Sequence, residues 1–324
     1  MEYGYTLMSE EHGPVELVGV ARDAEAAGFS FVVQSDHFHP WVPEQEHSPN
    51  AWVTLGAVAQ ATSEVRLQTF VTCPFLRYHP AVVAQQAATL ACLAEGRFTL
   101  SLGAGERLNE HVVGRGWPPV DVRHEMLAES AQVIRLLWSG GYQSFRGRHV
   151  TLEDARIFDL PDGLPPIAIA VSGGASLQIA IEHADELVAT EPASELVSQF
   201  RDAKGADAIA TTQLPVCFSS DASSGLETAR QYFRWSALGW KVQAELPNPV
   251  NFDAASAQVR PDDLQDTIPT GPDPQPYVDA VKKMRDAGFD RLAFVQVGPD
   301  QRQFFDFWDS ELRDALRELE PAGV

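Results

Sequence analysis

The strongest constraint on the fold is a regular alternation of short apolar runs with longer amphipathic stretches along nearly the whole chain. The apolar runs predict eight strands, at Tyr3–Met8, Phe29–Ser35, Val65–Phe70, Phe98–Gly103, Ile167–Val171, Glu186–Thr190, Leu214–Phe218 and Arg291–Val297. The stretches between them have helical periodicity and predict helices at Val15–Ala27, Ala51–Ala61, Ala81–Leu93, Arg123–Trp138, Leu177–Glu182, Ser194–Ala203, Ser223–Trp235 and Tyr277–Ala287. Eight such pairs predict an α/β fold, a (β/α)8 TIM barrel.

A doubly wound sheet is the alternative that the same alternation allows. That fold usually has a GxGxxG turn after its first strand, whereas Ser9–Pro14 (SEEHGP) follows here. We therefore predict a barrel that forms a single domain over residues 1–324. Two segments interrupt the pattern: the turn-rich Ser139–Pro166, which resembles a small β excursion, and the proline-rich Gly239–Pro276. Both are interpreted as insertions in the βα loops, near the mouth of the barrel.

Composition excludes several classes of partner. Asp and Glu (45) far outnumber Lys and Arg (24), and the net charge of −21 argues against nucleic acid and anionic membranes. The three cysteines have no disulfide or metal spacing, and there is no HxH or HExxH pattern, so we expect no metal. No apolar run reaches the length of a membrane span, and the first residues lack the features of a secretion signal. We expect a cytoplasmic protein that acts on a small molecule.

Chemistry in a TIM barrel is carried by polar side chains that directly follow the strands. The second predicted strand is followed by Asp36 and His37, an acid beside an imidazole that titrates near neutral pH. This pair is a candidate for proton transfer. The same residues are equally compatible with a capping Asp36 and a half-buried His37 that have no chemical role.

Two glycine-containing turns follow the fourth and fifth predicted strands. The first, Gly103–Gly105, would let the backbone approach a ligand and would place Glu106 at the mouth, although a tight turn with Glu106 in water fits as well. The second, Ser172-Gly173-Gly174, opens a helix whose free N–H groups suit a phosphate. It would also serve as a plain connector.

Four motifs together resemble a known superfamily: SDHFHPW (35–41), RYHPAVVAQQAATL (77–90), GRFTLSLGAGERLNEHVVGRGWP (96–118) and AVSGGAS (170–176). Their order is similar to that of the luciferase-like flavin and deazaflavin oxidoreductases, and within them the coenzyme F420-dependent glucose-6-phosphate dehydrogenase family. The similarity extends from YGYTLMSEEHGP to DQRQFFDFWDSELRDALREL. The resemblance implies a TIM barrel that binds F420 at its C-terminal mouth, hydride transfer to or from the deazaflavin ring, and a homodimer.

The resemblance also implies roles for individual residues. His37 matches the general base that takes the substrate hydroxyl proton, Trp41 an aromatic wall beside it, and Glu106 an acid near the ring, a task that requires a protonated carboxyl. The residues that match cofactor contacts are Asp36, Phe70, Val71, Cys73, Asn109, Ser172, Gly173 and Gly174, with a cis peptide between Phe70 and Val71 and the glycine pair around the cofactor phosphate.

The chain departs from the family at the positions that would bind a sugar phosphate. Ala193 stands where the family has a lysine, and Thr267 where it has an arginine. A second lysine aligns near Gln243, with Lys241 close enough to leave the register open. Because a phosphate dianion requires several cations, we expect a neutral alcohol, sugar or hydroxylated metabolite rather than glucose 6-phosphate. The expected substrate contacts are Thr190, Glu191, Trp240 and Lys241.

Three alternatives remain open at this point. The chain could be an FMN-dependent luciferase-like monooxygenase, an F420-dependent reductase that works in the opposite direction, or an F420-binding protein without catalysis. The poly-glutamate tail of F420 also predicts a basic rim on this acidic protein, for which Arg77, Arg107 and Arg115 are the candidates.

Overall fold

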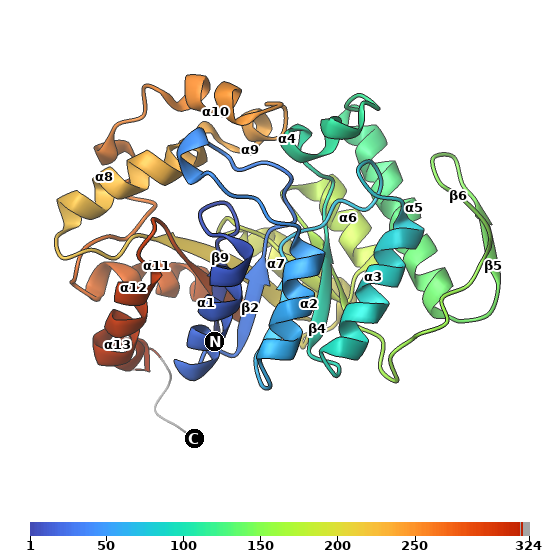
Figure 1. Ribbon diagram of the computed structural model, residues 1–324, viewed down its shortest axis with the longest axis horizontal. Coiled ribbons are helices and arrows are strands. Elements are labelled where there is room, and N and C mark those ends of the chain that lie inside the picture. Colours follow the sequence, from blue (N-terminus) through green and yellow to red (C-terminus); the bar gives the residue numbers. More distant parts are fainter. Residues whose placement is uncertain (318, 320–324) are drawn as a thin grey trace.

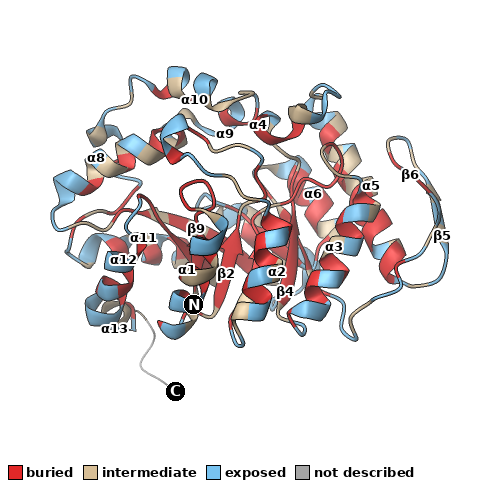
Figure 2. Ribbon diagram, viewed as in Figure 1, coloured by how far each residue is buried: buried red, intermediate tan, exposed pale blue. Residues whose placement is uncertain are grey.

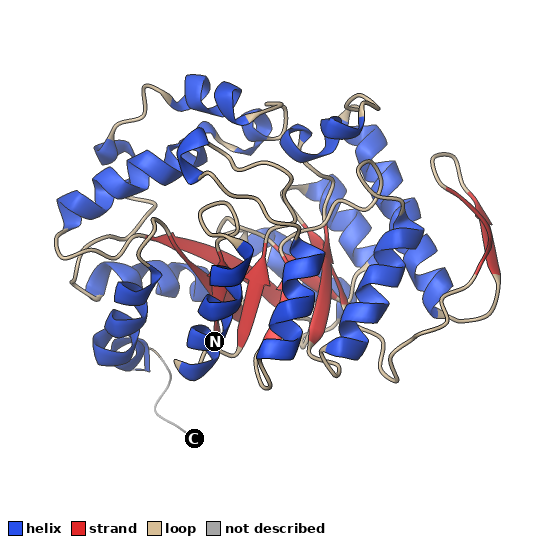
Figure 3. Ribbon diagram, in the orientation of Figure 1, coloured by secondary structure: helices blue, strands red, loops and turns tan. Residues whose placement is uncertain are grey.

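The strands close into a parallel barrel in the computed structural model, which describes residues 1–317 and 319. The barrel strands are β1 (Glu2–Leu7), β2 (Phe31–Gln34), β3 (Arg66–Thr69), β4 (Phe98–Leu102), β7 (Ile167–Ala170), β8 (Glu186–Val188), β9 (Ala210–Val216) and β10 (Arg291–Gln296). They pair in chain order, and β10 pairs back onto β1. Helices surround this ring of strands (Figure 3). The predicted TIM barrel is confirmed; the last residues of the predicted domain, 318 and 320–324, lie outside the described residues.

Long helices cover the outside of the barrel (Figure 1). They are α1 (Pro14–Ala26), α2 (Ala51–Ala61), α3 (Pro80–Leu93), α5 (Val120–Trp138), α6 (Gly174–His183), α7 (Ser194–Lys204), α11 (Gln275–Asp286) and α12 (Gln301–Phe307). Shorter helical segments are η1 (Pro43–Gln45), α4 (Arg107–Glu110), η2 (His111–Val113), η5 (Trp308–Leu312) and α13 (Arg313–Arg317). The helices after the last strand are missing from our prediction, and the predicted helix Ser223–Trp235 does not cover the barrel but belongs to a loop insertion.

The apolar core has two layers, one on each side of the strands. The larger layer lies between the barrel and the helices, where alternate strand residues such as Tyr5, Leu100 and Phe294 are fully buried. The smaller layer fills the lumen and includes Phe31 and Val33. Figure 2 shows the strands as the most continuously buried part of the chain. Since both faces of each strand are covered, the strands read as nearly continuous apolar runs.

Two details of the predicted boundaries are wrong. Strand β9 begins at Ala210, four residues before the predicted start, because Thr211, Thr212 and Gln213 are polar residues of a buried strand. The two AGF motifs end helices α1 and α11 as predicted, with positive φ at Gly28 and Gly288. Their phenylalanines are buried in the core but lie two residues before each strand rather than opening it.

The segment Ser139–Pro166 contains a hairpin of β5 (Gln143–Arg146) and β6 (Thr151–Ala155), which confirms the predicted β excursion. Its place in the fold was predicted wrongly: it connects α5 to β7 and is therefore an αβ connection, not a βα loop. Glu129 on α5 accepts hydrogen bonds from the backbone N–H groups of the hairpin turn and fixes it to the side of that helix. The predicted order of elements, with a helix before the segment and a strand after it, already indicates an αβ connection.

The segment Gly239–Pro276 is a true βα insertion between β9 and α11, and it begins earlier than predicted. It starts with α8 (Ala222–Phe233) and η3 (Arg234–Leu238), and continues through α9 (Trp240–Gln243), α10 (Pro249–Ser256) and η4 (Pro261–Leu264). The prolines begin short helices rather than preventing them. These helices lie over one end of the barrel, above the loop that follows β2 (Figure 1).

None of the helices in the described part of the chain combines the length and the apolar character that a membrane span requires.

Candidate active site

His37 lies at the centre of the site, between two carboxylates from different strands. Its Nδ1 is 2.7 Å from Glu10 Oε1 and its Nε2 is 3.3 Å from Glu106 Oε2. These residues follow β2, β1 and β4, so the barrel brings together three segments that are far apart in sequence. Because ionised carboxylates are negatively charged and only accept hydrogen bonds, a histidine between two of them is favoured as the imidazolium.

Electrostatics agree with that geometry. Burial by itself lowers the pKa of His37, but the negative charge of Glu10, followed by that of Glu106, more than offsets this and raises the pKa to about 10. Burial would likewise raise the pKa of Glu10, and the charge and hydrogen bond of His37 reverse this, so that it is lowered. The structure therefore holds His37 protonated and Glu10 ionised at neutral pH.

Asp36, the residue before His37, is held by several side-chain hydrogen bonds. Its carboxylate accepts four hydrogen bonds, from Trp52 Nε1, Thr72 Oγ1, Arg77 Nη2 and Tyr78 OH, at 2.9–3.1 Å. Arg77 Nη2 also donates to the backbone carbonyl of Asp36. These bonds anchor the chain to the segment after β3 at the residue that directly precedes His37. The predicted contact of Asp36 with the cofactor stays a prediction.

Asn109 ties the second and fourth strand ends together. Its Oδ1 accepts from the backbone N–H groups of Phe38 and His39, at 2.8 and 3.3 Å, and its Nδ2 donates to Glu106 Oε2 at 2.9 Å. One amide thus fixes both the loop that carries His37 and the Glu106 carboxylate. The predicted cofactor contact of Asn109 is likewise untested.

Trp41 packs edge-on against His37, with ring centroids 5.0 Å apart, as the predicted aromatic wall requires. Its other neighbours come from the insertion: Trp235 is stacked on it at 4.0 Å with an interplanar angle of 11°, and Phe252 meets it edge-on. The indole N–H of Trp235 is buried without a hydrogen-bond partner. The insertion therefore reaches the candidate site through an aromatic stack.

The segment after β3 has the backbone feature that the resemblance implies, a cis peptide bond between Phe70 and Val71. Phe70 is buried in the lumen and Val71 is partly exposed. A Cβ at Gly103 would lie 2.5 Å from Val71 Cγ2, and a Cβ at Gly105 would lie 2.7 Å from Cys73 Sγ. These glycines allow the turn after β4 to pack closely on the cis segment.

The turn Ser172–Gly174 opens helix α6 after β7. Ser176 Oγ accepts from the N–H groups of Ser172 and Gly173, so the residue that caps the turn lies inside the helix. A Cβ at Gly173 or Gly174 would meet nothing within 4 Å, so this backbone faces open space. A helix N-terminus with free space in front of it fits an anionic group.

The predicted substrate contacts lie at the rim. Thr190, Glu191, Trp240 and Lys241 are all exposed. Gln243 is buried, and its Nε2 donates to the carbonyls of Trp235 and Ser236, which holds the insertion together. Thr267 is exposed, with its hydroxyl bonded to the backbone. The predicted substrate contacts stay predictions, whereas Gln243 has a structural role inside the insertion.

The predicted basic rim is wrong for Arg77. This guanidinium is nearly buried and lies between two carboxylates, Asp36 at 3.0 Å and Glu110 at 3.6 Å. Arg107 is exposed at the start of α4 and Arg115 lies in the exposed loop after η2. The reason for the error is that Arg77 neutralises local acids, which a count of charges cannot show.

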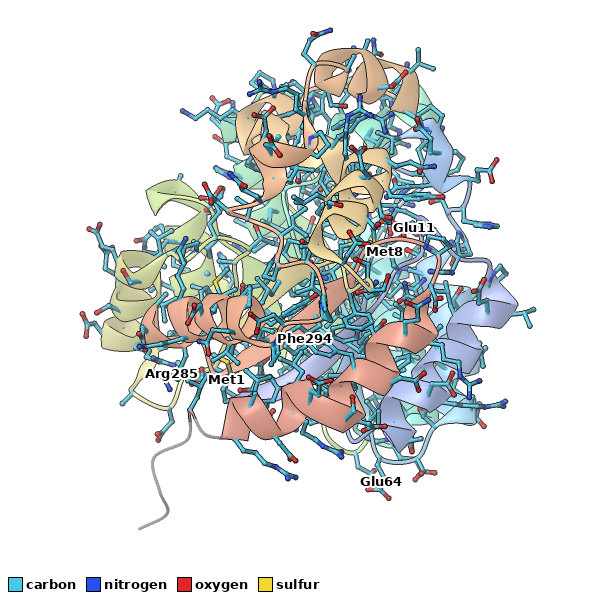
Figure 4. The ribbon with its side chains drawn as sticks, turned by 90° about the vertical axis from the view of Figure 1, so that its left-hand side faces the viewer. Met1, Met8, Glu11, Glu64, Arg285 and Phe294 are labelled. Atoms are coloured by element: carbon cyan, nitrogen blue, oxygen red, sulfur yellow. The ribbon has the colours of Figure 1, made fainter. Side chains whose placement is uncertain are left out.

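Sequence reasoning missed two acids in the segment after β1. Glu10 completes the contact set of His37, and the adjacent Glu11 accepts from the Gly298 N–H at 2.7 Å and from Gln45 Nε2 at 3.4 Å. Burial raises the pKa of Glu11 to about 8. Figure 4 shows Met8 and Glu11 on this segment, below the insertion helices. Their position directly after a strand was the signal that could have found them.

Within the described residues the structure holds no cluster of His, Cys, Asp and Glu suited to a metal ion, and the three cysteines are free.

Comparison with known proteins places this geometry in a family. The model of the luciferase-like monooxygenases matches residues 1–291. The F420-dependent glucose-6-phosphate dehydrogenases of Tsukamurella paurometabola and Mycobacterium avium are 34% and 33% identical, over 98% of this chain and 99% of each relative. A solved F420-dependent secondary alcohol dehydrogenase, in complex with an F420–acetone adduct, superposes with a TM-score of 0.89 at 27% identity, over 98% of this chain and 99% of that one. The chain therefore belongs to the luciferase-like monooxygenase family and is a relative of the F420-dependent glucose-6-phosphate dehydrogenases.

Proposed function

We propose that the protein is an F420-dependent oxidoreductase that moves a hydride between the cofactor and a carbinol carbon of a small, non-phosphorylated substrate. The observation that carries the proposal is the pair formed by His37 Nε2 and Glu106 Oε2 at the C-terminal mouth of the barrel. The relatives are named F420-dependent dehydrogenases, which supports the cofactor. A proton-exchanging pair beside a hydride carrier is what the interconversion of an alcohol and a carbonyl compound requires.

The residues present fit an elongated anionic cofactor. Gly173 and Gly174 would hold its phosphate, because the backbone there faces open space at the start of α6. The cis segment at Val71 and the turn at Gly103 would support the ring on one side, next to Glu106. When bound, F420 supplies the position that accepts or donates the hydride.

His37 would exchange the substrate proton. In the reductive direction it already carries a proton at Nε2 and can donate it to a carbonyl oxygen. In the oxidative direction Nε2 must be free to accept the substrate proton, which requires the His37 imidazolium to have lost its own proton. The two proposed roles, base for His37 and acid for Glu106, thus fall on two groups whose polar atoms are 3.3 Å apart. Glu10, at Nδ1, would hold the imidazole in place in either direction.

The ligand-free state favours the reductive direction at neutral pH, since His37 is protonated there. We propose that catalysis in the direction of alcohol oxidation rises with pH as the His37–Glu106 pair loses its proton. A plot of log(kcat/KM) against pH for both directions would test this. For oxidation, log(kcat/KM) should rise with pH up to about 10, whereas for reduction it should stay level up to about 10 and fall above it. Parallel profiles would contradict the assignment.

The substrate class follows from charge. Glucose 6-phosphate would need cations near the insertion, and Arg234 is already paired with Glu44 and Asp253. Ala193, Gln243 and Thr267 supply no charge, and exposed Lys241 is one cation where a dianion needs several. The insertion instead contributes Trp235, which stacks on Trp41, the ring that packs against His37. Apolar rings of this kind favour a neutral alcohol, sugar or ketone.

The decisive experiment combines binding with turnover. Purified protein is titrated with F420 and with FMN, and fluorescence quenching gives each Kd. Loss of the visible absorbance of F420 is then followed with neutral secondary alcohols, sugars and glucose 6-phosphate. Tight binding of F420 with turnover of a neutral alcohol is expected; binding of FMN alone would favour the monooxygenase alternative, and turnover restricted to glucose 6-phosphate would refute the substrate class.

Variants separate catalysis from binding. His37→Ala and Glu106→Gln should each lower kcat by about 10²–10⁴-fold, the usual contribution of a positioned proton-transfer group. His149→Ala, in the turn of the β5–β6 hairpin and paired with Glu125, serves as the control. Full turnover by both site variants, with F420 still bound, would support a carrier protein instead. The homodimer and the cytoplasmic location stay predictions, the first of which light scattering would test.

A further inference from the structure

A buried arginine, which is not one of the residues around His37 described above, binds the turn that directly precedes Glu106. Arg123, on α5, is 3% exposed, and its guanidinium lies against the Trp117 ring, 4.0 Å from the centroid. Its Nη1 donates to the carbonyls of Ala104 and Gly105 at 3.4 and 3.2 Å, and its Nε donates to the Pro118 carbonyl at 3.1 Å. Ala104 and Gly105 directly precede Glu106.

The turn needs such an anchor because its own residues are small. Gly105 has a φ of +76°, and a Cβ there would lie 2.7 Å from Cys73 Sγ, so only glycine fits. A glycine turn has wide conformational freedom when it is not tied down. The two carbonyl contacts of Arg123 supply the tie from outside the turn.

The residue after Glu106 is held from another direction. The backbone N–H of Arg107 donates to the carbonyl of Ala244, at the end of α9, at 3.0 Å. The next insertion residue, Glu245, accepts from Arg123 Nη2 at 3.2 Å. Both sequence neighbours of Glu106 are therefore hydrogen-bonded: Gly105 to Arg123, which pairs with Glu245 of the insertion, and Arg107 directly to Ala244 of the insertion.

Among the described residues Glu245 is the carboxylate that pairs with Arg123. An exposed acid contributes little in general to stability when it forms a surface pair. Here its partner is buried, so the loss of the negative charge leaves the guanidinium without a counter-ion. A small movement of the insertion at Glu245 would consequently displace Arg123 and, with it, the turn that precedes Glu106.

We propose that Arg123 is a positioning residue that fixes Glu106 against His37, and that Glu245 couples this position to the insertion over the mouth. The inference rests on the proposed function for its catalytic meaning. The geometry it predicts can be measured without turnover. Substrate that contacts the insertion would thereby stabilise the Glu106 carboxylate in its working position.

The test compares Arg123→Lys and Glu245→Gln with Arg201→Lys, which alters an arginine that pairs with Asp290 away from the site. The His37 imidazole is titrated by NMR in ligand-free protein. When Glu106 moves away, the carboxylate no longer stabilises the imidazolium, so the His37 pKa should fall in both site variants and stay unchanged in Arg201→Lys. In addition kcat should fall by about 10²-fold in Arg123→Lys, as expected for a displaced catalytic group.

Each outcome decides the proposal. Unchanged titration of His37 in Arg123→Lys, together with a lower Tm like that of Arg201→Lys, would assign Arg123 to packing and overturn the inference. If Arg123→Lys does not fold, Glu245→Gln still decides, because Glu245 is exposed and its loss leaves the core intact. Failure of the proposed function is distinguishable: wild-type protein would then not turn over F420, whereas the titration of His37 would still respond to the variants.

Discussion

Replacing Glu10 with glutamine isolates the contribution of one carboxylate to the raised pKa of His37. Glutamine has the shape of glutamate and still offers a carbonyl oxygen to His37 Nδ1, so the change removes the charge while keeping the packing. Glu10 is 1% exposed and lies 2.7 Å from the imidazole, whereas Glu106 lies at 3.3 Å and is partly exposed. Glu10 should therefore raise the pKa of His37 more than Glu106 does.

The magnitude follows from the pKa of His37. A rise from 6.5 to about 10 corresponds to roughly 5 kcal/mol, at about 1.4 kcal/mol per unit. Burial opposes this rise, so the two carboxylates together contribute more than the net value. If Glu10 contributes more than half, its removal costs the imidazolium at least about 3 kcal/mol, and His37 should titrate at least about two pH units lower. Because the folded pKa is raised, the stabilisation is complete below pH 6.5 and is lost as the pH rises through about 10. In Glu10→Gln this loss should occur at lower pH.

The assay is the NMR titration of the His37 ring between pH 5 and 10.5, with urea unfolding at pH 7 and 9.5 as the second readout. Glu16→Gln is the matched control, since it removes an exposed carboxylate that contacts His12 in the neighbouring turn. A His37 titration that moves by less than half a pH unit in Glu10→Gln would refute the charge-pair reasoning. A shift of the same size in the control would mean that the net charge of the protein, not the contact, is responsible.

Three further outcomes are expected. Asp36→Asn should lower the free energy of unfolding by about 3–5 kcal/mol, because Arg77 loses its buried counter-charge; urea unfolding measures this, and a loss under 1 kcal/mol would contradict it. Glu11→Gln should stabilise the protein at pH 8 by about 4 kcal/mol, with no gain near pH 4, since a raised carboxyl pKa costs stability as the pH rises from about 4.5 to 8; equal effects at both pH values in calorimetry would be inconsistent with this. Gly173→Asp should weaken F420 binding about tenfold through repulsion at the start of α6, while Gly163→Asp, also in open space, should not; fluorescence quenching distinguishes them.

The barrel could be predicted because its pattern is local. Strands such as β7 and β10 are apolar on both faces, and their helices are periodic, so residue type alone specifies each element. The insertion could not be predicted in detail, because its short helices are stabilised by packing on Trp41 and Phe252 rather than by their own periodicity. The start of β9 was missed for a related reason: its residues there are polar, and Gln213 finds its partner on a strand far away in sequence, Thr6 on β1.

The site was predictable only in part. Rules about strand ends point to His37 and Glu106, since each follows a strand, but not to their contact, because β3 lies between β2 and β4 and the loops must curve over it. Glu10 follows a strand too, yet its importance depends on the orientation of His37 Nδ1. Arg123 lies in a helix, with no local signal that its guanidinium binds the turn before Glu106. Pairings of this kind depend on tertiary geometry.

The parallel stack of Trp41 on Trp235 gives the protein an optical reporter. Two indole rings 4.0 Å apart and nearly parallel should couple their electronic transitions and produce a paired signal in circular dichroism. One ring follows strand β2 and the other belongs to the insertion, so the signal exists only while the two segments are docked. Stopped-flow detection of this signal would follow movement of the insertion during the catalytic cycle without any added label.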